Sequence, residues 1–138
     1  GKLYWNEFQT HPISKLPNVR MLDFIDRMDM AYAVCDLCVA RAGAITLSEL
    51  AVTQTIAILV PSPNVAEDHQ RKNAEAMVRE EAAWMILDSE AKTKLWNTIQ
   101  NLMMDDNWKN KIKNNLSRIA KPLAAQTIAQ EIIKCLNK

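Results

Sequence analysis

The residue types best placed to do chemistry follow a lone internal glycine. Gly43, Thr46 and Glu49 form the pattern G-x-x-T-x-x-E, and the chain has only one other glycine, its first residue. Glycine serves where the backbone turns sharply or approaches a ligand. Amides at the start of a helix bind anions, so those of Ala44, Ile45 and Thr46 suit phosphate. The carboxylate of Glu49, about one helical turn later, suits the hydroxyls of a ribose.

Phosphate and ribose together describe a nucleotide, but the pattern has a second interpretation that needs no ligand. Gly43 would then only turn the chain, and Glu49 would lie on a solvated helix face. The spacing alone does not choose between the two interpretations.

A second polar group lies in the segment PSPNVAEDHQRKN, which ends at Asn73. His69 and Asn73 are four residues apart and share a helix face, and Gln70 is adjacent. Their uncharged donors and acceptors suit sugar hydroxyls and amides. The alternative is that they cap and solvate the first turn of a helix. His69 has no partner nearby in sequence for acid–base catalysis.

A third group of candidates is apolar and lies in the segment FIDRM. Phe24, Ile25 and Met28 have the shape and polarity to line the face of a flat ring. Core packing is the commoner role of such residues, so both interpretations stay open at this stage.

The cysteines predict buried, unreactive thiols. There are three, an odd number that argues against a disulfide framework and suits a reducing compartment. Cys35 and Cys38 form a C-x-x-C motif, but at the end of an expected helix and not at its start. A zinc site would need two further ligands close by, and His11, His69 and Cys135 are all remote in sequence.

Composition sets the class of protein. A chain of 138 residues with 49% apolar content fits one globular domain. The net charge of +1 predicts no nucleic-acid or membrane-surface partner. No apolar stretch reaches the roughly 20 residues that span a bilayer, and the first residues do not have the pattern of a signal peptide. A cytosolic location is therefore the default expectation.

These candidate residues need elements that position them, and the apolar pattern predicts strands alternating with helices. The strands expected are Val19–Phe24, Leu37–Arg41, Ala57–Pro61 and Ala83–Leu87. The helices expected are 28–35, 44–52, 67–81, one around Leu95–Met103, one over Trp108–Ile119, and one that starts at Pro122. Such alternation predicts an α/β fold with a Rossmann-like parallel sheet and flanking helices.

In parallel sheets, ligands bind at the carboxyl ends of the strands. That rule selects three loops, which are Phe24–Met28, Ala42–Thr46 and Ser62–Gln70. Each loop contains or leads into one of the three groups of candidate residues, so a shared site at this end of the sheet is expected.

Taken in order, these loops resemble a known family. The block FIDRMDMAYAVCDLCVARAGAITLSELA, followed by AILVPSPNVAEDHQRKNA, is similar to the donor-binding half of the MurG family. Members of that family transfer N-acetylglucosamine from UDP-N-acetylglucosamine to lipid I, which makes lipid II for peptidoglycan. The resemblance runs from about Arg20 to the end of the chain, and its two quoted blocks are specific.

The resemblance implies a role for each candidate residue. Ile25 and Met28 would contact the uracil. The turn at Gly43, which with Arg41 matches the family's R-x-G, leads to the residues expected at the diphosphate. These are Ala44, Ile45 and Thr46, and Glu49 would bind the ribose. His69, Gln70 and Asn73 would reach the sugar. No catalytic residue, metal ligand set or cofactor is implied for this segment.

The sequence departs from the family pattern at three places. A glycine expected before the third strand is replaced within TQTI (Thr53–Ile56), and another is replaced near Ala82. We expect altered loop geometry there, away from the ligand. His69 stands where the family has a glutamine, which affects the detail of sugar recognition.

The resemblance also implies that the chain is an incomplete donor-binding domain. The whole chain, 1–138, would be part of the C-terminal domain of a GT-B enzyme, with strands and helices over about 19–88 and only helices over about 90–137. The opening strand of that domain and the whole acceptor domain would be absent. The strands that normally lie between Val19–Phe24 and Leu37–Arg41 would then be missing, which leaves the latter with an open edge.

Two hypotheses of different classes follow. In the first, the segment is the donor half of a hexosyltransferase, inactive alone, whose missing half binds lipid I. The parent would be cytoplasmic and peripheral on the inner face of the cell membrane. In the second, it is a non-catalytic nucleotide-sugar-binding subunit completed by a separate partner chain.

Overall fold

The computed structural model describes residues 5–63 and 68–136. The chain divides into two compact units, with the boundary after Val34.

The first unit contains short helices and a long irregular segment. Its elements are α1 (Trp5–Phe8), the 3-10 turn η2 (Pro12–Lys15) and α2 (Met28–Ala33). The strand expected over Val19–Phe24 is wrong, because this segment is irregular and its Leu22 and Phe24 side chains are exposed. A strand needs a hydrogen-bonded neighbour, and no partner strand for it occurs among the described residues.

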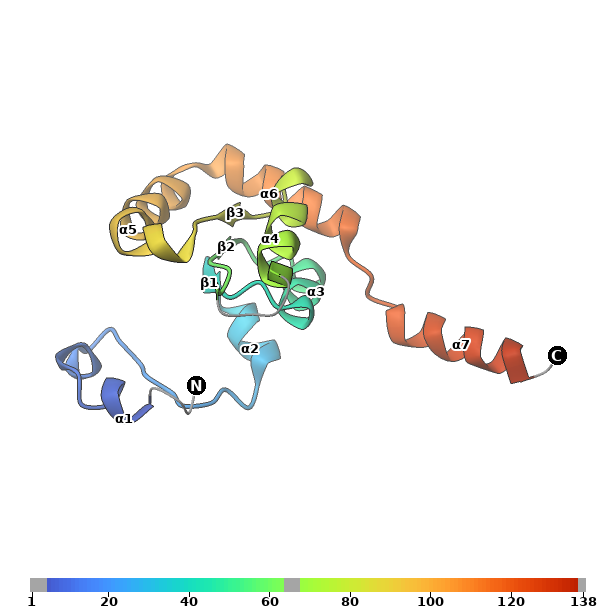
Figure 1. Cartoon of the computed structure of the whole chain (residues 1–138), viewed down its shortest axis with the longest axis horizontal. Helices are drawn as coiled ribbons and strands as arrows, with labels where there is room; N and C mark the ends of the chain where they lie inside the picture. The colour runs from blue at the N-terminus through green and yellow to red at the C-terminus, as the bar shows by residue number, and fades with distance from the viewer. Residues whose placement is uncertain (1–4, 64–67, 137–138) are drawn as a thin grey trace. The chain divides into compact units, whose positions relative to one another are not determined.

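The second unit is built on a three-stranded parallel sheet. Its strands are β1 (Cys38–Ala40), β2 (Ala57–Leu59) and β3 (Trp84–Met85), in the order β1-β2-β3 (Figure 1). Cys38 pairs with Ala57, and Ile58 pairs with Trp84. The other three predicted strands are therefore confirmed, each shorter than expected.

Five helices accompany this sheet, and their existence is confirmed. They are α3 (Ala44–Thr53), α4 (His69–Arg79), α5 (Asp88–Met104), α6 (Asp106–Ile119) and α7 (Ala124–Leu136). Figure 1 shows α3 and α4 on one side of the sheet and α5 on the other. The last helix begins at Ala124, because Pro122 lies in the preceding turn and not at the first helical position.

The start of α4 also differs from the expectation. Asp68 precedes the helix with φ 57°, in the left-handed region, so it is not part of an acidic first turn. Glu67, expected beside it, lies outside the described residues.

Part of the core of this unit lies between the sheet and α5. Ile58, Val60, Ile86 and Leu102 form one buried cluster, with the apolar face of α5 packed against it. All three residues of β2 are buried because helices cover both faces of the sheet, which is why this strand is continuously apolar.

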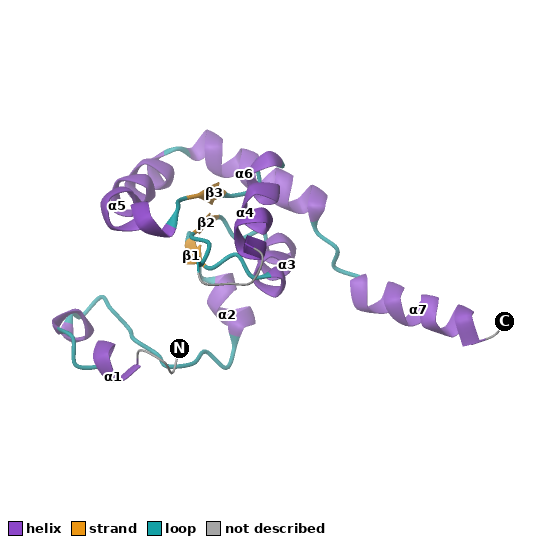
Figure 2. Ribbon diagram, in the orientation of Figure 1, coloured by secondary structure: helices purple, strands orange, loops and turns teal. Residues whose placement is uncertain are grey.

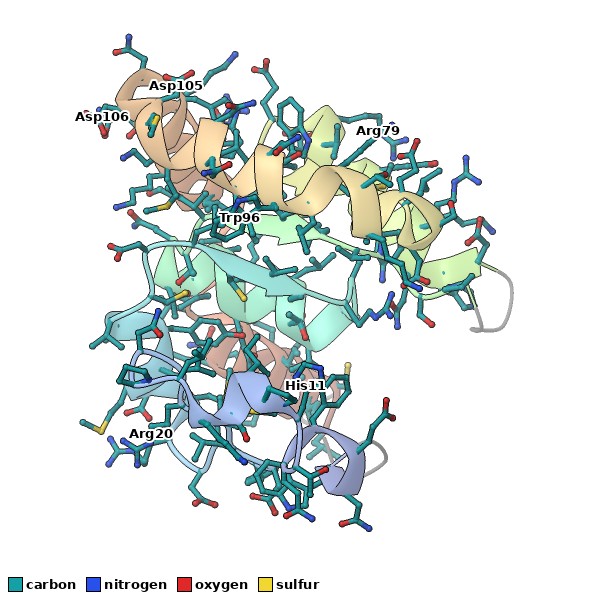
Figure 3. The ribbon with its side chains drawn as sticks, turned by 90° about the vertical axis from the view of Figure 1, so that its left-hand side faces the viewer. His11, Arg20, Arg79, Trp96, Asp105 and Asp106 are labelled. Carbon is teal, nitrogen blue, oxygen red and sulfur yellow. The ribbon has the colours of Figure 1, made fainter. Side chains whose placement is uncertain are left out.

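Polar side chains order the last helices. The Asp105 carboxylate accepts a hydrogen bond from the Trp108 amide at 2.9 Å and so caps α6. Figure 3 labels Asp105 and Asp106 together at this end of the helix. The next helix, α7, has no buried residue.

Two turns hold non-glycine residues in the left-handed conformation. Gln54 ends α3 with φ 54°, and Glu81 follows α4 with φ 49°. These are the turns where the sequence lacks the family's glycines. The chain therefore keeps a left-handed residue at each position without the residue type that adopts it freely.

Replacing Gln54 with glycine is expected to raise the free energy of unfolding by about 1 kcal/mol. Glycine has no Cβ to strain in this conformation, and that relief exceeds its extra freedom in the unfolded chain. Urea unfolding of the two proteins under one set of conditions measures the difference. Gln54→Ala, which keeps a Cβ, is the control and should show no gain. A gain equal to that of the glycine variant would contradict the strain argument.

Candidate functional site

The turn after β1 forms the start of the candidate site. The loops that follow β1 and β2 lie at the carboxyl ends of these parallel strands (Figure 2). Gly43 is the residue before α3, with φ −71° and ψ 145°. The sharp glycine-specific turn considered from the sequence is therefore wrong, because any residue can adopt this extended backbone.

Gly43 leaves room at the start of the helix among the described residues. Of these, only the Thr46 Oγ1 atom would meet a Cβ placed on Gly43, at 3.8 Å. Gly43 also brings no side chain to cap the first amides of α3. The amides of Ala44, Ile45 and Thr46 lie in the first turn of α3, so they have no acceptor within the helix. Such free amides at a helix start are the arrangement that binds anions.

Glu49 lies on the same helix as these amides. It is half-buried and three residues beyond Thr46, so it is on the neighbouring turn. The expected helix start, with the carboxylate one turn further on, is thus present in the structure. Its binding of a nucleotide remains a prediction.

Side chains of α4 connect the two loops. The Asn73 Nδ2 atom donates to the carbonyl oxygen of Ala42 at 3.1 Å. The Gln70 Oε1 atom accepts a hydrogen bond from the Ser62 amide at 2.9 Å. The structure therefore brings Asn73 next to the turn at Gly43, and Gln70 next to the loop that follows β2. It also shows Asn73 and Gln70 holding the backbone of these loops, a role that the sequence alone did not reveal.

The remaining predicted residues differ in their surroundings. His69 is the first residue of α4 and is exposed. Ile25 is 40% exposed and Met28 is 36% exposed, so neither is a core residue. Both belong to the first unit, whereas Gly43 and Glu49 belong to the second. Their contact with a uracil therefore stays a prediction.

Sequence reasoning missed one partner at this edge. Asp88, the first residue of α5, forms an ion pair with Arg41. The two residues are 47 positions apart, and no local pattern connects them.

The cysteine pair lies at the amino end of β1, whereas the candidate site lies at the carboxyl ends of the strands. Cys38 is the first residue of β1, and Cys35 lies just before it, as expected. Burial raises the pKa of the Cys38 thiol to about 11, and the neighbouring Cys35 adds to this. Burial also raises the pKa of Cys35. Both thiols are therefore protonated at neutral pH, which makes them weak nucleophiles.

Cys35 and Cys38 are half-buried and Cys135 is exposed, so the prediction of a buried thiol is wrong for Cys135. Cys35 and Cys38 are expected to react with iodoacetamide at pH 8 more slowly than Cys135. With a pKa of about 11, about one Cys38 thiol in a thousand is a thiolate at that pH. Mass spectrometry of the peptides over time measures the three rates. In urea the three rates should converge. Labelling of Cys38 in the folded protein as fast as that of Cys135 would refute the expectation.

No group of three His, Cys, Asp or Glu residues within the described residues is placed to hold a metal ion. No helix in this part of the chain has the length and apolar character to cross a membrane.

A parallel sheet with flanking helices, and with a helix that starts after Gly43 at the carboxyl end of a strand, defines a Rossmann-like α/β domain. The chain belongs to glycosyltransferase family 28, since the model of the C-terminal domain of that family matches residues 1–132. Its fold matches the crystal structure of Acinetobacter baumannii MurG, with a TM-score of 0.80 and 27% identity over 97% of this chain and 39% of that one. The resemblance to the MurG family, with the C-terminal domain of a GT-B enzyme, is confirmed.

Two bacterial relatives share the name UDP-N-acetylglucosamine--N-acetylmuramyl-(pentapeptide) pyrophosphoryl-undecaprenol N-acetylglucosamine transferase. The one from Flavobacterium psychrophilum is 40% identical over 137 residues, which is 99% of this chain and 37% of the relative. The one from Bacteroides thetaiotaomicron is 43% identical over 136 residues, or 97% and 37%. The chain therefore spans little more than a third of the length of these relatives.

Proposed function

We propose that this chain is the donor-binding part of a longer glycosyltransferase. The whole protein would transfer N-acetylglucosamine from UDP-N-acetylglucosamine to lipid I, which makes lipid II for peptidoglycan. Its named relatives are N-acetylglucosamine transferases, and the family model covers nearly the whole chain. The segment alone would be inactive, because the acceptor site would belong to the rest of the protein.

The observation that carries the proposal is the start of α3. Its first amides receive no hydrogen bond from a capping side chain, a Cβ on Gly43 would lie 3.8 Å from Thr46 Oγ1, and Glu49 follows on the next turn. The amides would bind the diphosphate and stabilise the negative charge that develops on it as it leaves. Glu49 would accept hydrogen bonds from the two ribose hydroxyls.

The other candidate residues complete this assignment. Ile25 and Met28 would contact the uracil, and His69 with Gln70 would reach the sugar. Asn73 would shape the site through its hydrogen bond to Ala42. In the proposed reaction, a hydroxyl of the acceptor would attack the anomeric carbon of the sugar. The configuration at that carbon would be inverted as the diphosphate leaves.

The unpaired side of β1 supports the proposal that another strand pairs with it. Among the described strands, β1 is paired with β2 alone, and its Val39 side chain is 44% exposed. A strand with a free edge pairs readily with another. We propose that a strand from the rest of the protein, or from a separate subunit, pairs with β1. The rest of the protein would also bind lipid I and place the enzyme at the inner face of the cell membrane.

Calorimetric titration of the full-length protein with UDP tests the proposed site. Binding of UDP, with no comparable binding of ADP, is the expected result, together with transfer of N-acetylglucosamine to a lipid I analogue. Absence of UDP binding would refute the proposal. Light scattering of the same sample separates a single chain from one that requires a second subunit.

A further inference from the structure

Arg41 joins the ends of two strands to the start of α5. Its guanidinium Nη1 atom donates to the carbonyl oxygen of Val60 at 3.1 Å and lies 3.4 Å from that of Pro61. The same nitrogen pairs with the carboxylate of Asp88. One side chain therefore links the turn after β1 to the end of β2 and to the first residue of α5.

The same turn is held from its other side as well. Ala42 is fully buried, and its carbonyl accepts the hydrogen bond from Asn73. Arg41 and Ala42 directly precede Gly43, so both attachments act on the backbone that directs the first amides of α3. Glycine is the most freely rotating residue, so the direction of the helix start depends on such attachments.

We propose that Arg41 and Asp88 are a positioning pair that holds the start of α3 in the orientation needed for nucleotide binding. The inference rests on the proposed function, because it assigns the pair to the same site. Arg41 acts here through the backbone of its own turn. Asp88 acts by fixing the guanidinium against the end of β2.

A direct contact between Arg41 and a phosphate is the competing explanation, and Asp88 separates the two. Asp88 is a negative charge at the edge where an anionic ligand would bind. Removing that charge, or releasing Arg41 toward a phosphate, would strengthen UDP binding. Loss of a positioning contact would weaken it. The direction of the change therefore decides between the explanations.

The first experiment measures UDP affinity of the full-length protein by calorimetry. Arg41→Gln and Asp88→Asn are each expected to weaken UDP binding by about fivefold, the effect of a largely exposed ion pair with supporting hydrogen bonds. The double variant should be no weaker than either single variant, because the two residues act as one unit. Glu90→Gln is the matched control, since Glu90 lies in the same turn of α5 but pairs with Lys94. It should leave the affinity unchanged.

The second experiment needs no ligand. Hydrogen exchange of the Leu47 amide, which donates to the carbonyl oxygen of Gly43 at 3.0 Å, should be faster in Arg41→Gln and in Asp88→Asn, while the amides of Ile112 and Leu116 in α6 stay unchanged. General destabilisation would instead accelerate exchange in both places. In Glu90→Gln, exchange should match that of the unmodified protein.

The outcomes separate the inference from the proposed function. Equal or tighter UDP binding by Asp88→Asn overturns the positioning pair, and so does unchanged exchange of the Leu47 amide in the two variants. An unmodified protein that does not bind UDP overturns the proposed function. The exchange measurement still tests the pair in that case.

Discussion

Replacing Glu49 with alanine is expected to weaken UDP binding by the full-length protein roughly 10- to 100-fold. A carboxylate that accepts two hydrogen bonds from ribose hydroxyls contributes about 1.5–3 kcal/mol, and that range converts to this loss of affinity. Calorimetry with UDP measures it. The half-buried position of Glu49 on α3, one turn after the first amides, is the structural basis of the expectation.

Ligand and protein changes together identify the contact. UDP that lacks both ribose hydroxyls should bind the unmodified protein as weakly as UDP binds Glu49→Ala, and the variant should not distinguish the two ligands. Glu49→Gln keeps the size and loses the charge, so its affinity should fall between the two proteins. Unchanged UDP affinity in Glu49→Ala would remove the ribose assignment.

Replacing Gly43 with alanine is expected to separate folding from binding. The free energy of unfolding should change by less than about 1 kcal/mol, because an alanine at this position of a helix start is only mildly unfavourable. The backbone at φ −71° accepts any residue, and among the residues that the structure describes the added Cβ would meet only Thr46 Oγ1, at 3.8 Å. UDP affinity should nevertheless fall at least about tenfold, since the methyl group would occupy space where phosphate approaches the amides.

Uridine is the control ligand for this variant, because it has no phosphate. Its affinity should be the same for Gly43→Ala and for the unmodified protein. Urea unfolding provides the second measurement. A large loss of stability, or an unchanged UDP affinity, would show that the glycine serves packing and not the ligand.

The sequence predicted the parts of the fold that neighbouring residues specify. The continuous apolar residues at Ala57–Leu59 indicated a strand buried on both faces, and the structure places the fully buried β2 there. The helix after Gly43 was also predicted, from the glycine and the residues that follow it. Periodicity and local backbone preference are written in consecutive residues, so both features could be inferred.

Features that depend on distant segments were not predicted correctly. Val19–Phe24 has the composition of a strand, but a strand forms only beside another, and none is available to it among the described residues. The assignment of Asn73 to a sugar could not show that its side chain bonds to Ala42, 31 residues earlier.

The candidate site shows the same division. Its residue types and their order along the chain were determined by the sequence, from Gly43 and Glu49 to Asn73. The conformation of Gly43, and the contacts of Arg41 with Val60 and Asp88, were decided only by the tertiary structure. A hydrogen bond between segments 19 or 47 residues apart depends on how strands and helices pack, and consecutive residues carry little information about that packing.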